Sequence, residues 1–327
     1  MKFSLSYTDP NQLSETLQEL DQVTRITQLE LGEGNYVMSH QKSTNLAIAE
    51  ISATKTLLYE GWGTDWSVDF NWITPHRKAT HFGYCEGYEM RANSIAGFRT
   101  FNSSPGGSWG KYSDACSSTA CMLNRQILIQ SLEDCNAINA LENLTNHKGI
   151  DTDNQAFAQL KRLTRRELTS EILSSAKYYD LIIACLETGS RRKFKKSDIK
   201  NQRLLGEIVD LSHDIGKMRS PLTLSEVCQY LDASQASLYR VCQDTFGMGI
   251  IEMMTQVRLE EARRALLYKR LEPTNDRHTV KEIALSYGFK HQGRFSRRYF
   301  TNFGELPSQT LERDRMVSFE KRNRLSP

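Results

Sequence analysis

The sequence predicts an α+β fold, with a β-rich part, a helical part and an all-α part in that order along the chain. Short alternating apolar runs before residue 132 indicate strands, and apolar residues at helical spacing follow them. Further on, one local pattern occurs twice, with the start and stop signals of short helices. We therefore expect a β-rich domain over 1–132, a helical linker or dimerisation region over 133–212, an all-α domain over 213–312 and a polar tail over 313–327.

The first part of the chain has the pattern of an antiparallel β-structure. Runs such as Ile26–Leu31 and Val68–Ile73 alternate apolar and polar residues. Clusters of Gly and Asn separate these runs at intervals of roughly 8–12 residues. This spacing predicts a β-sandwich or a β-barrel. Leu13, Leu17 and Leu20 fall at helical spacing and predict a short helix ahead of it.

Three tryptophans in this part, Trp62, Trp66 and Trp72, are candidates for a ligand site. Ligand pockets are lined mainly by apolar and aromatic side chains, so the three could line one inside the β-rich domain. The alternative is that the same side chains fill the core of that domain. The sequence leaves both interpretations open.

The residues that could hold a metal ion are badly spaced for one. His76, His81 and Glu86 lie close in sequence, but they lack the His-x-His pattern that a metal-dependent β-barrel enzyme would need. Cys116 and Cys121 do not match a usual zinc spacing, and no Cys or His pair follows to complete four ligands. We therefore expect neither a metal nor another cofactor.

The cysteine count and the N-terminus predict a cytoplasmic protein. The seven cysteines are an odd number, and the polar residues that follow Met1 at once do not form a signal peptide. No apolar run approaches the ~18 residues that a membrane-spanning helix needs. We therefore expect no membrane partner.

The repeated pattern opens with Thr-x-x-Glu and closes with Phe-Gly. The openings are Thr223–Glu226 and Thr279–Glu282, and the closings are Phe246–Gly247 and Phe303–Gly304. In each opening the Thr hydroxyl can accept from the third helical N–H, while the Glu side chain reaches back to the Thr N–H. This capping box predicts that a helix starts at each opening.

Each copy then reads as two short helices joined by a tight turn. The first helices are expected over Ser225–Leu231 and Lys281–Tyr287, and Gly288 suits a turn position that needs a positive φ. In the second helices, Leu238, Val241, Cys242, Phe295 and Tyr299 are expected to face inward, and Gln235, Ala236, Tyr239, Arg240, Gln243, Gln292, Gly293, Arg294 and Arg297 outward. This arrangement is a helix-turn-helix, and its second helix has the shape and donors to enter a DNA major groove.

A longer helix is expected between the copies, over about Ile250–Arg270. Its apolar side would carry Met253, Met254, Val257, Ala262, Ala265 and Leu266, and its solvated side Glu260, Glu261, Arg263, Arg264, Lys269 and Arg270. A helix of about 18 residues spans roughly 27 Å. It would hold the two second helices about one DNA turn apart.

The charge is distributed unevenly. From Arg219 onward the net charge is +5, whereas the remainder of the chain carries −2. The positive end is the one with the two helix-turn-helix copies, which fits a polyanionic partner there.

These motifs resemble the C-terminal DNA-binding domain of the AraC/XylS family of bacterial transcription regulators. The residues that carry the resemblance are Leu238–Arg240, Phe246–Gly247, Arg258–Arg263, Glu282–Ala284, Tyr287–Phe289, Phe295–Arg297 and Tyr299–Ser308. The chain departs from the family pattern at Gly249-Ile250, where the first copy usually has a proline. This departure concerns the shape of that turn.

The resemblance implies where DNA is contacted and what controls the protein. Carried onto this chain, the contact positions are Ala236, Tyr239, Arg240, Gly293, Arg294 and Arg297. It further implies a cupin-like β-barrel sensor at the N-terminus, dimer contacts from the helices before 213, promoter DNA and RNA polymerase as partners, and activation of transcription. The segment 213–312 would then be the DNA-binding domain.

The main alternative is an enzyme, namely a DNA alkyl-transferase fused to the same DNA-binding domain. Such an enzyme needs an activated thiolate in a cationic, exposed setting, and none of the seven cysteines has one in sequence. We therefore expect a regulator without catalytic activity. Whether its N-terminal domain senses a small molecule or a partner protein stays open.

Overall fold

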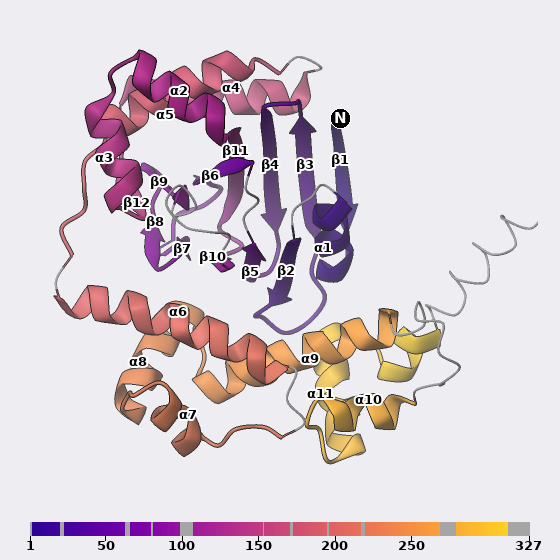
Figure 1. Ribbon diagram of the computed structural model, residues 1–327. Helices are drawn as coiled ribbons and strands as arrows, with labels where there is room; N and C mark the ends of the chain where they lie inside the picture. Colours follow the sequence, from indigo (N-terminus) through magenta and orange to yellow (C-terminus); the bar gives the residue numbers. More distant parts are fainter. Residues whose placement is uncertain are drawn as a thin grey trace, which may run out of the picture. The chain divides into compact units, whose positions relative to one another are not determined.

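The computed structural model describes residues 2–312, apart from 20–22, 63–65, 80, 99–106, 153, 171–172, 195, 217–219 and 269–278 (Figure 1). The predicted tail over 313–327 lies outside the described residues. Contacts divide the chain into two compact units. Unit 1 comprises Met1–Ile26 and Gly34–Gly206, and unit 2 comprises Thr27–Glu33 and Glu207–Pro327. The domain boundaries drawn from the sequence stay a prediction.

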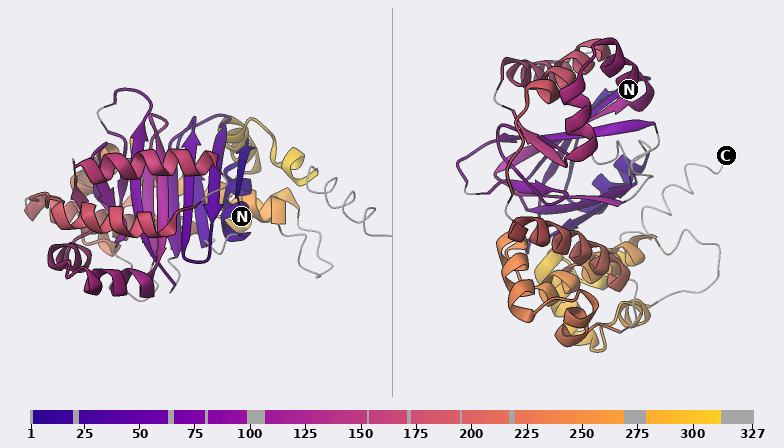
Figure 2. Two further views of the ribbon diagram at one scale, coloured as in Figure 1. Left: turned by 90° about the horizontal axis from the view of Figure 1, so that it is seen from above. Right: turned by 60° about the vertical axis from the view of Figure 1, so that its left-hand side comes forward.

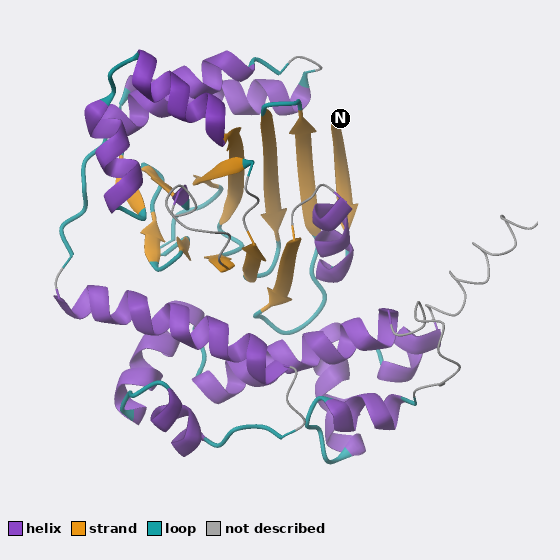
Figure 3. Cartoon of the chain, viewed as in Figure 1, coloured by secondary structure: helices purple, strands orange, loops and turns teal. Residues whose placement is uncertain are grey.

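Unit 1 is built on two antiparallel sheets (Figure 3). One sheet has the strand order β1-β3-β4-β11-β6-β9-β12, and the other has the order β2-β5-β10-β7-β8. The strands are β1 (Lys2–Tyr7), β2 (Val23–Gln28), β3 (Tyr36–Lys42), β4 (Leu46–Ala53), β5 (Leu57–Trp62), β6 (Ser67–Pro75), β7 (Gly83–Cys85), β8 (Tyr88–Met90), β9 (Ser94–Ala96), β10 (Gly107–Tyr112), β11 (Cys116–Asn124) and β12 (Gly149–Asp151). The expected β-rich N-terminal part is therefore present.

Apolar side chains fill the space between the two sheets. One cluster joins Tyr36 and Met38 of β3 to Leu57 of β5, together with Leu13 and Leu17 of helix α1 (Pro10–Glu19). Because successive residues of a strand point to opposite faces, Tyr36 and Met38 reach the same face of the sheet. The predicted early helix thus packs its two described leucines into this core.

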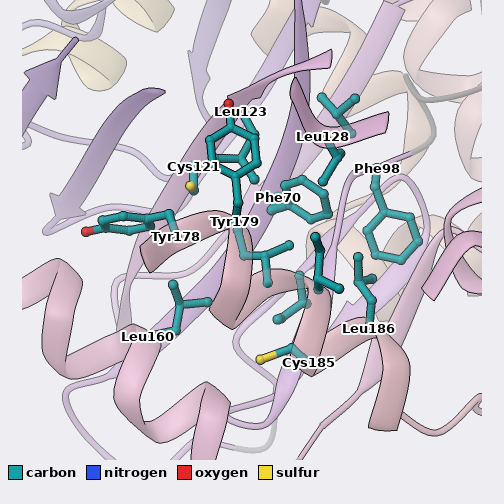
Figure 4. Close-up of a cluster of buried hydrophobic side chains, with 14 of the residues drawn as sticks. Phe70, Phe98, Cys121, Leu123, Leu128, Leu160, Tyr178, Tyr179, Cys185 and Leu186 are labelled. Atoms are coloured by element: carbon teal, nitrogen blue, oxygen red, sulfur yellow. The ribbon is translucent and has the colours of Figure 1, made fainter. Parts of the chain in front are cut away.

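Four helices cover the outer face of the larger sheet (Figures 1 and 2). They are α2 (Arg125–Asp134), α3 (Ile138–Asn146), α4 (Gln155–Thr169) and α5 (Ser175–Thr188). Asn154 caps α4, because its side-chain oxygen accepts from the N–H of Phe157 at 2.8 Å. Phe70 of β6, Leu160 of α4 and Tyr178 of α5 belong to one buried cluster (Figure 4). The helices predicted in this part of the sequence therefore share a core with the sheet.

The basic residues after α5 are held in place by acidic partners within unit 1. Arg192 pairs with Asp151 at 2.5 Å and lies over the ring of Tyr88 at 4.4 Å. Arg191 pairs with Glu142 at 2.6 Å. Arg191 and Arg192 are therefore held by ion pairs within unit 1.

Unit 2 is helical in its main body. It contains the second part of α6 (Lys196–Gly216), then α7 (Leu224–Tyr230), α8 (Gln235–Phe246), α9 (Ile250–Tyr268), α10 (Val280–Ser286) and α11 (Gln292–Phe303). The order of paired short helices on either side of one long helix is the predicted one. The mixed α+β fold class is confirmed.

Helix α9 differs from its prediction on one side. Its expected apolar residues are buried, but Glu260 and Arg263, which were expected in solvent, are buried too. Arg263 donates to Glu305 at 3.1 Å, and its guanidinium lies 4.3 Å from the ring centroid of Phe303. The prediction was wrong because periodicity shows the most apolar face and does not show how many neighbours surround a central helix. Lys269 and Arg270 lie outside the described residues.

Within the described part of the chain, no helix combines the length and the apolar character needed to span a membrane.

Candidate nucleic-acid interface

Both helix-turn-helix copies begin with the predicted capping box. The N–H of Glu226 donates to the Thr223 hydroxyl at 3.3 Å, and the N–H of Thr223 donates to the Glu226 carboxylate at 2.6 Å. In the second copy the corresponding distances are 3.2 Å and 2.7 Å, between Thr279 and Glu282. These bonds satisfy N–H groups that a helix start leaves without partners. They also hold the carboxylate ionised, because the bonds from Thr223 lower the pKa of Glu226.

The turns and the second helices also agree with the sequence. Gly288 has a φ of +81°, as the prediction required, and it ends α10 sharply. In the first copy Ser234 caps α8, since its hydroxyl accepts from the N–H of Ser237 at 3.2 Å. The two turns therefore differ in sequence and in capping, because His291 at the start of α11 makes no such side-chain hydrogen bond.

The inward faces of the second helices are packed into small cores. Leu238, Val241 and Cys242 of α8 are buried. On α11, the rings of Phe295 and Tyr299 lie 5.6 Å apart, and the Tyr299 hydroxyl is hydrogen-bonded to the Thr310 hydroxyl at 2.8 Å. Ring packing on one side fixes the rotation of α11 about its axis, and so determines which residues face outward.

The outward faces carry the six positions that the sequence singled out for DNA. Ala236, Tyr239 and Arg240 are exposed on α8, and Gly293, Arg294 and Arg297 are exposed on α11. Tyr239 is 64% exposed, which is high for an aromatic side chain. The structure thus places three of these positions together on each second helix.

The three arginines among them have unused donors. Within the described residues, no hydrogen bond or ion pair engages the guanidinium of Arg240, Arg294 or Arg297. A guanidinium has five N–H donors in a planar fork that matches guanine O6 and N7 or two phosphate oxygens. At Gly293, an added Cβ would have no neighbour within 4 Å, so this position is open to solvent.

Two further parts of this surface were not predicted from the sequence. Arg298, next to Arg297, is also exposed on α11, and adjacent arginines in the sequence could have indicated it. A cavity of about 430 Å³ is lined by Arg294, Arg297 and Arg298 together with Leu29 and Leu31 from the segment 27–33. No sequence signal connects that segment to α11.

The three candidate ligand-binding tryptophans lie in different surroundings. Trp72 is 1% exposed and packs its edge against Phe157 of α4, with ring centroids 6.5 Å apart. Trp66 is partly exposed, and the Nζ of Lys42 lies 5.9 Å from its ring centroid. The backbone of Trp62 ends β5, and its side chain lies outside the described residues. A ligand role for the three stays a prediction.

The His residues considered as metal ligands have separate partners. His76 is hydrogen-bonded to Ser117 at 2.8 Å, whereas His81 contacts Glu89 at 2.9 Å. Within the described residues, no group of three or more His, Cys, Asp or Glu side chains is placed to hold a metal ion.

The buried cysteines are poorly suited to nucleophilic chemistry. Burial raises the pKa of Cys116 to about 11 and that of Cys185 and Cys242 to about 12. Burial also raises the pKa of Cys85 and Cys121. The thiolate is the reactive form, so these five side chains are protonated and weak nucleophiles at neutral pH. The alkyl-transferase alternative finds no support here.

The chain is similar to known regulators. A family described as a helix-turn-helix domain matches residues 227–313. The XylDLEGF operon transcriptional activator 2 of Pseudomonas putida is 30% identical over 149 residues, which cover 45% of this chain and 91% of that protein. The XylDLEGF operon transcriptional activators 1 and 3 of the same organism are 30% and 29% identical, and the chain spans 39% and 47% of their lengths.

A solved structure also aligns with part of the chain. It is a transcriptional regulator of Chromobacterium violaceum with an AraC-type DNA-binding domain, 23% identical, covering 36% of this chain and 96% of that one with a TM-score of 0.30. The match to 91% of the first Pseudomonas putida activator at 30% identity shows the family: this chain belongs to the AraC/XylS family of DNA-binding transcription regulators.

Proposed function

We propose that this protein activates transcription by reading two successive major grooves of promoter DNA with α8 and α11. The observation that carries the proposal is the pair of capped helix-turn-helix motifs. Each has, on the exposed face of its second helix, guanidinium groups that make no hydrogen bond or ion pair with the described residues. Helix α9, with 19 residues, is about 28 Å long and connects the two motifs. That length suits second helices about one DNA turn, roughly 34 Å, apart.

Each exposed position has a role that follows from its chemistry. Arg240, Arg294 and Arg297 would donate to guanine O6 and N7 or to phosphate oxygens. Tyr239 would contact a base edge or a sugar with its ring and a phosphate with its hydroxyl. Ala236 and Gly293 would allow the DNA backbone or a base methyl group to approach closely.

The partners other than DNA are part of the proposal. The Pseudomonas putida relatives are operon activators, which supports activation and hence contact with RNA polymerase in the cytoplasm. Unit 1 would control the DNA-binding helices in response to a small-molecule effector, and its helices would mediate a homodimer.

The proposal is tested by footprinting the purified full-length protein on genomic DNA, with and without a metabolite extract. We expect two protected segments separated by one helical turn on the same face of the duplex. A change of protection with extract would support control by a small molecule, and constant protection would support control by a partner protein. Absence of any sequence-specific footprint in both conditions would refute the proposed function.

A further inference from the structure

The DNA-binding unit contains a short piece of chain from near the N-terminus. Residues Thr27–Glu33 group with 207–327 in unit 2, so the contacts below lie inside a single compact unit. The segment begins with the last two residues of strand β2 and ends before β3 in the sequence. The segment belongs to neither helix-turn-helix motif, so its place in unit 2 needs an explanation of its own.

The segment has its own internal structure. The buried side chain of Gln28 donates from Nε2 to the carbonyl oxygen of Glu30 and to that of Gly32, the latter at 2.6 Å. Gly32 has a φ of +89°, a conformation that residues with a Cβ adopt rarely. The segment is therefore a turn held by one amide side chain and one glycine.

The first contact of this turn is with α9. The Nε2 of Gln256 donates to the carbonyl oxygen of Gln28 at 2.9 Å, and both side chains are buried. Leu29, the next residue, is only 4% exposed. A buried amide without its partner loses the free energy of that hydrogen bond and cannot regain it from water. The contact thus ties the segment to the central helix of the unit.

The second contact is with the end of α11. The N–H of Gly32 donates to the carbonyl oxygen of Asn302 at 3.1 Å. Asn302 lies in the last turn of α11, where carbonyl groups have no partner within the helix. Just beyond, a Cβ built on Gly304 would come within 2.7 Å of the Glu33 carboxylate. The segment therefore closes the C-terminal end of the second reading helix.

The segment lies beside the DNA-facing arginines without covering them. Leu29 and Leu31 line the same cavity as Arg294 and Arg297, yet both arginines stay exposed. A segment that blocked DNA would bury these side chains. Support of α11 is therefore the role that fits both the contacts of the segment and the exposure of the two arginines.

We propose that the segment 27–33 is a positioning element of the second helix-turn-helix, which fixes α11 against α9 and so aims Arg294 and Arg297 at their groove. This inference rests on the proposed function of α11 as a DNA reader. The hydrogen bonds described above join the segment to α9 and to the end of α11, so we expect its loss to affect the half of the DNA site that α11 reads.

The test compares a leucine of the segment with one outside it, in the full-length protein. Leu29→Ala removes a buried side chain, whereas the control Leu5→Ala, on strand β1, removes one that is 45% exposed. Each base contact is worth ~1–3 kcal/mol, so misplacing the contacts of α11 should weaken specific binding about tenfold or more. We expect Leu29→Ala to lose protection over the half-site read by α11 and to keep it over the other, while Leu5→Ala binds like the unaltered protein.

A second variant and a second measurement guard against simple unfolding. Gln256→Leu removes the donor to Gln28 with little change of volume and should reproduce the half-site loss. Hydrogen exchange should become faster in residues 292–303 and stay unchanged in residues 235–246. Equal loss over both half-sites, unchanged footprints in both variants, or tighter binding would each overturn the proposal. If the unaltered protein gave no footprint, the proposed function would fail instead.

Discussion

Burial of His40 makes the stability of unit 1 depend on pH. His40 lies on β3 with no exposed surface, stacked on the ring of Phe3 at 5.2 Å. Neither ring nitrogen has a hydrogen-bond partner among the described residues. Burial, with the nearby positive charge of Lys42, lowers the pKa of His40 to about 4. Protonation of His40 would therefore place a positive charge in a buried site where neither ring nitrogen has a hydrogen-bond partner among the described residues.

The magnitude follows from the difference between the folded and unfolded pKa. The unfolded value is 6.5 and the folded value is about 4, so the unfolded state binds the proton more readily. The free energy of unfolding should be unaffected above pH 6.5, fall between pH 6.5 and 4, and level off below. With ~1.4 kcal/mol per pKa unit, the full loss is about 3 kcal/mol, of which about 2 kcal/mol appears between pH 7 and 5.

Tryptophan fluorescence is a suitable assay because all four tryptophans lie in unit 1. Urea denaturation of the protein and of His40→Leu would be followed at several pH values between 7.5 and 4. Other groups titrate in both proteins, so the difference between the two isolates His40. This difference should shift by about 2 kcal/mol in favour of His40→Leu from pH 7 to 5. A difference that is constant with pH would refute the reasoning, since it would reflect packing alone.

The remaining predictions concern unit 2. Arg297→Ala should weaken specific DNA binding by ~1–3 kcal/mol if the side chain pairs with a base, as measured by titration against the cognate site and a scrambled one; equal loss on both DNAs would show a phosphate contact instead. Phe295→Ala removes a side chain that is 1% exposed and should lower the free energy of unfolding by ~3–5 kcal/mol, whereas Phe300→Ala, at a position 52% exposed, should change it by less than ~0.5 kcal/mol. Comparable effects of the two in thermal denaturation would contradict the assigned orientation of α11. Thr279→Ala removes the hydroxyl that accepts from Glu282 and should cost ~1 kcal/mol, measured in the same way; no effect would mean that the capping box contributes nothing to the folded state.

The features that could be predicted from the sequence are local ones. The capping boxes at Thr223 and Thr279, the positive φ of Gly288 and the inward orientation of Phe295 all depend on residues within a few positions of one another. Hydrogen bonds and helical periodicity over that range leave a direct pattern in the sequence. The fold class followed from the same kind of signal.

The features that could not be predicted depend on distant neighbours. Glu260 looks like a solvated residue by composition, and it is buried only because other helices surround α9. The contact of Gly32 with the end of α11 joins parts of the chain with no shared pattern. For Trp72, core packing and ligand binding both demand an aromatic residue, so the residue type alone could not separate them.

The hydrogen bond between Gln28 and Gln256 spans 228 positions, and this has a consequence for how the protein folds during synthesis. The ribosome makes the segment 27–33 long before the helices on which it docks. Contacts between residues far apart in sequence form slowly, because a long loop must close first. The second helix-turn-helix is therefore completed only after α11 has been made and the segment 27–33 has docked on it, and a nascent chain that stops before α11 holds only the first of the two motifs.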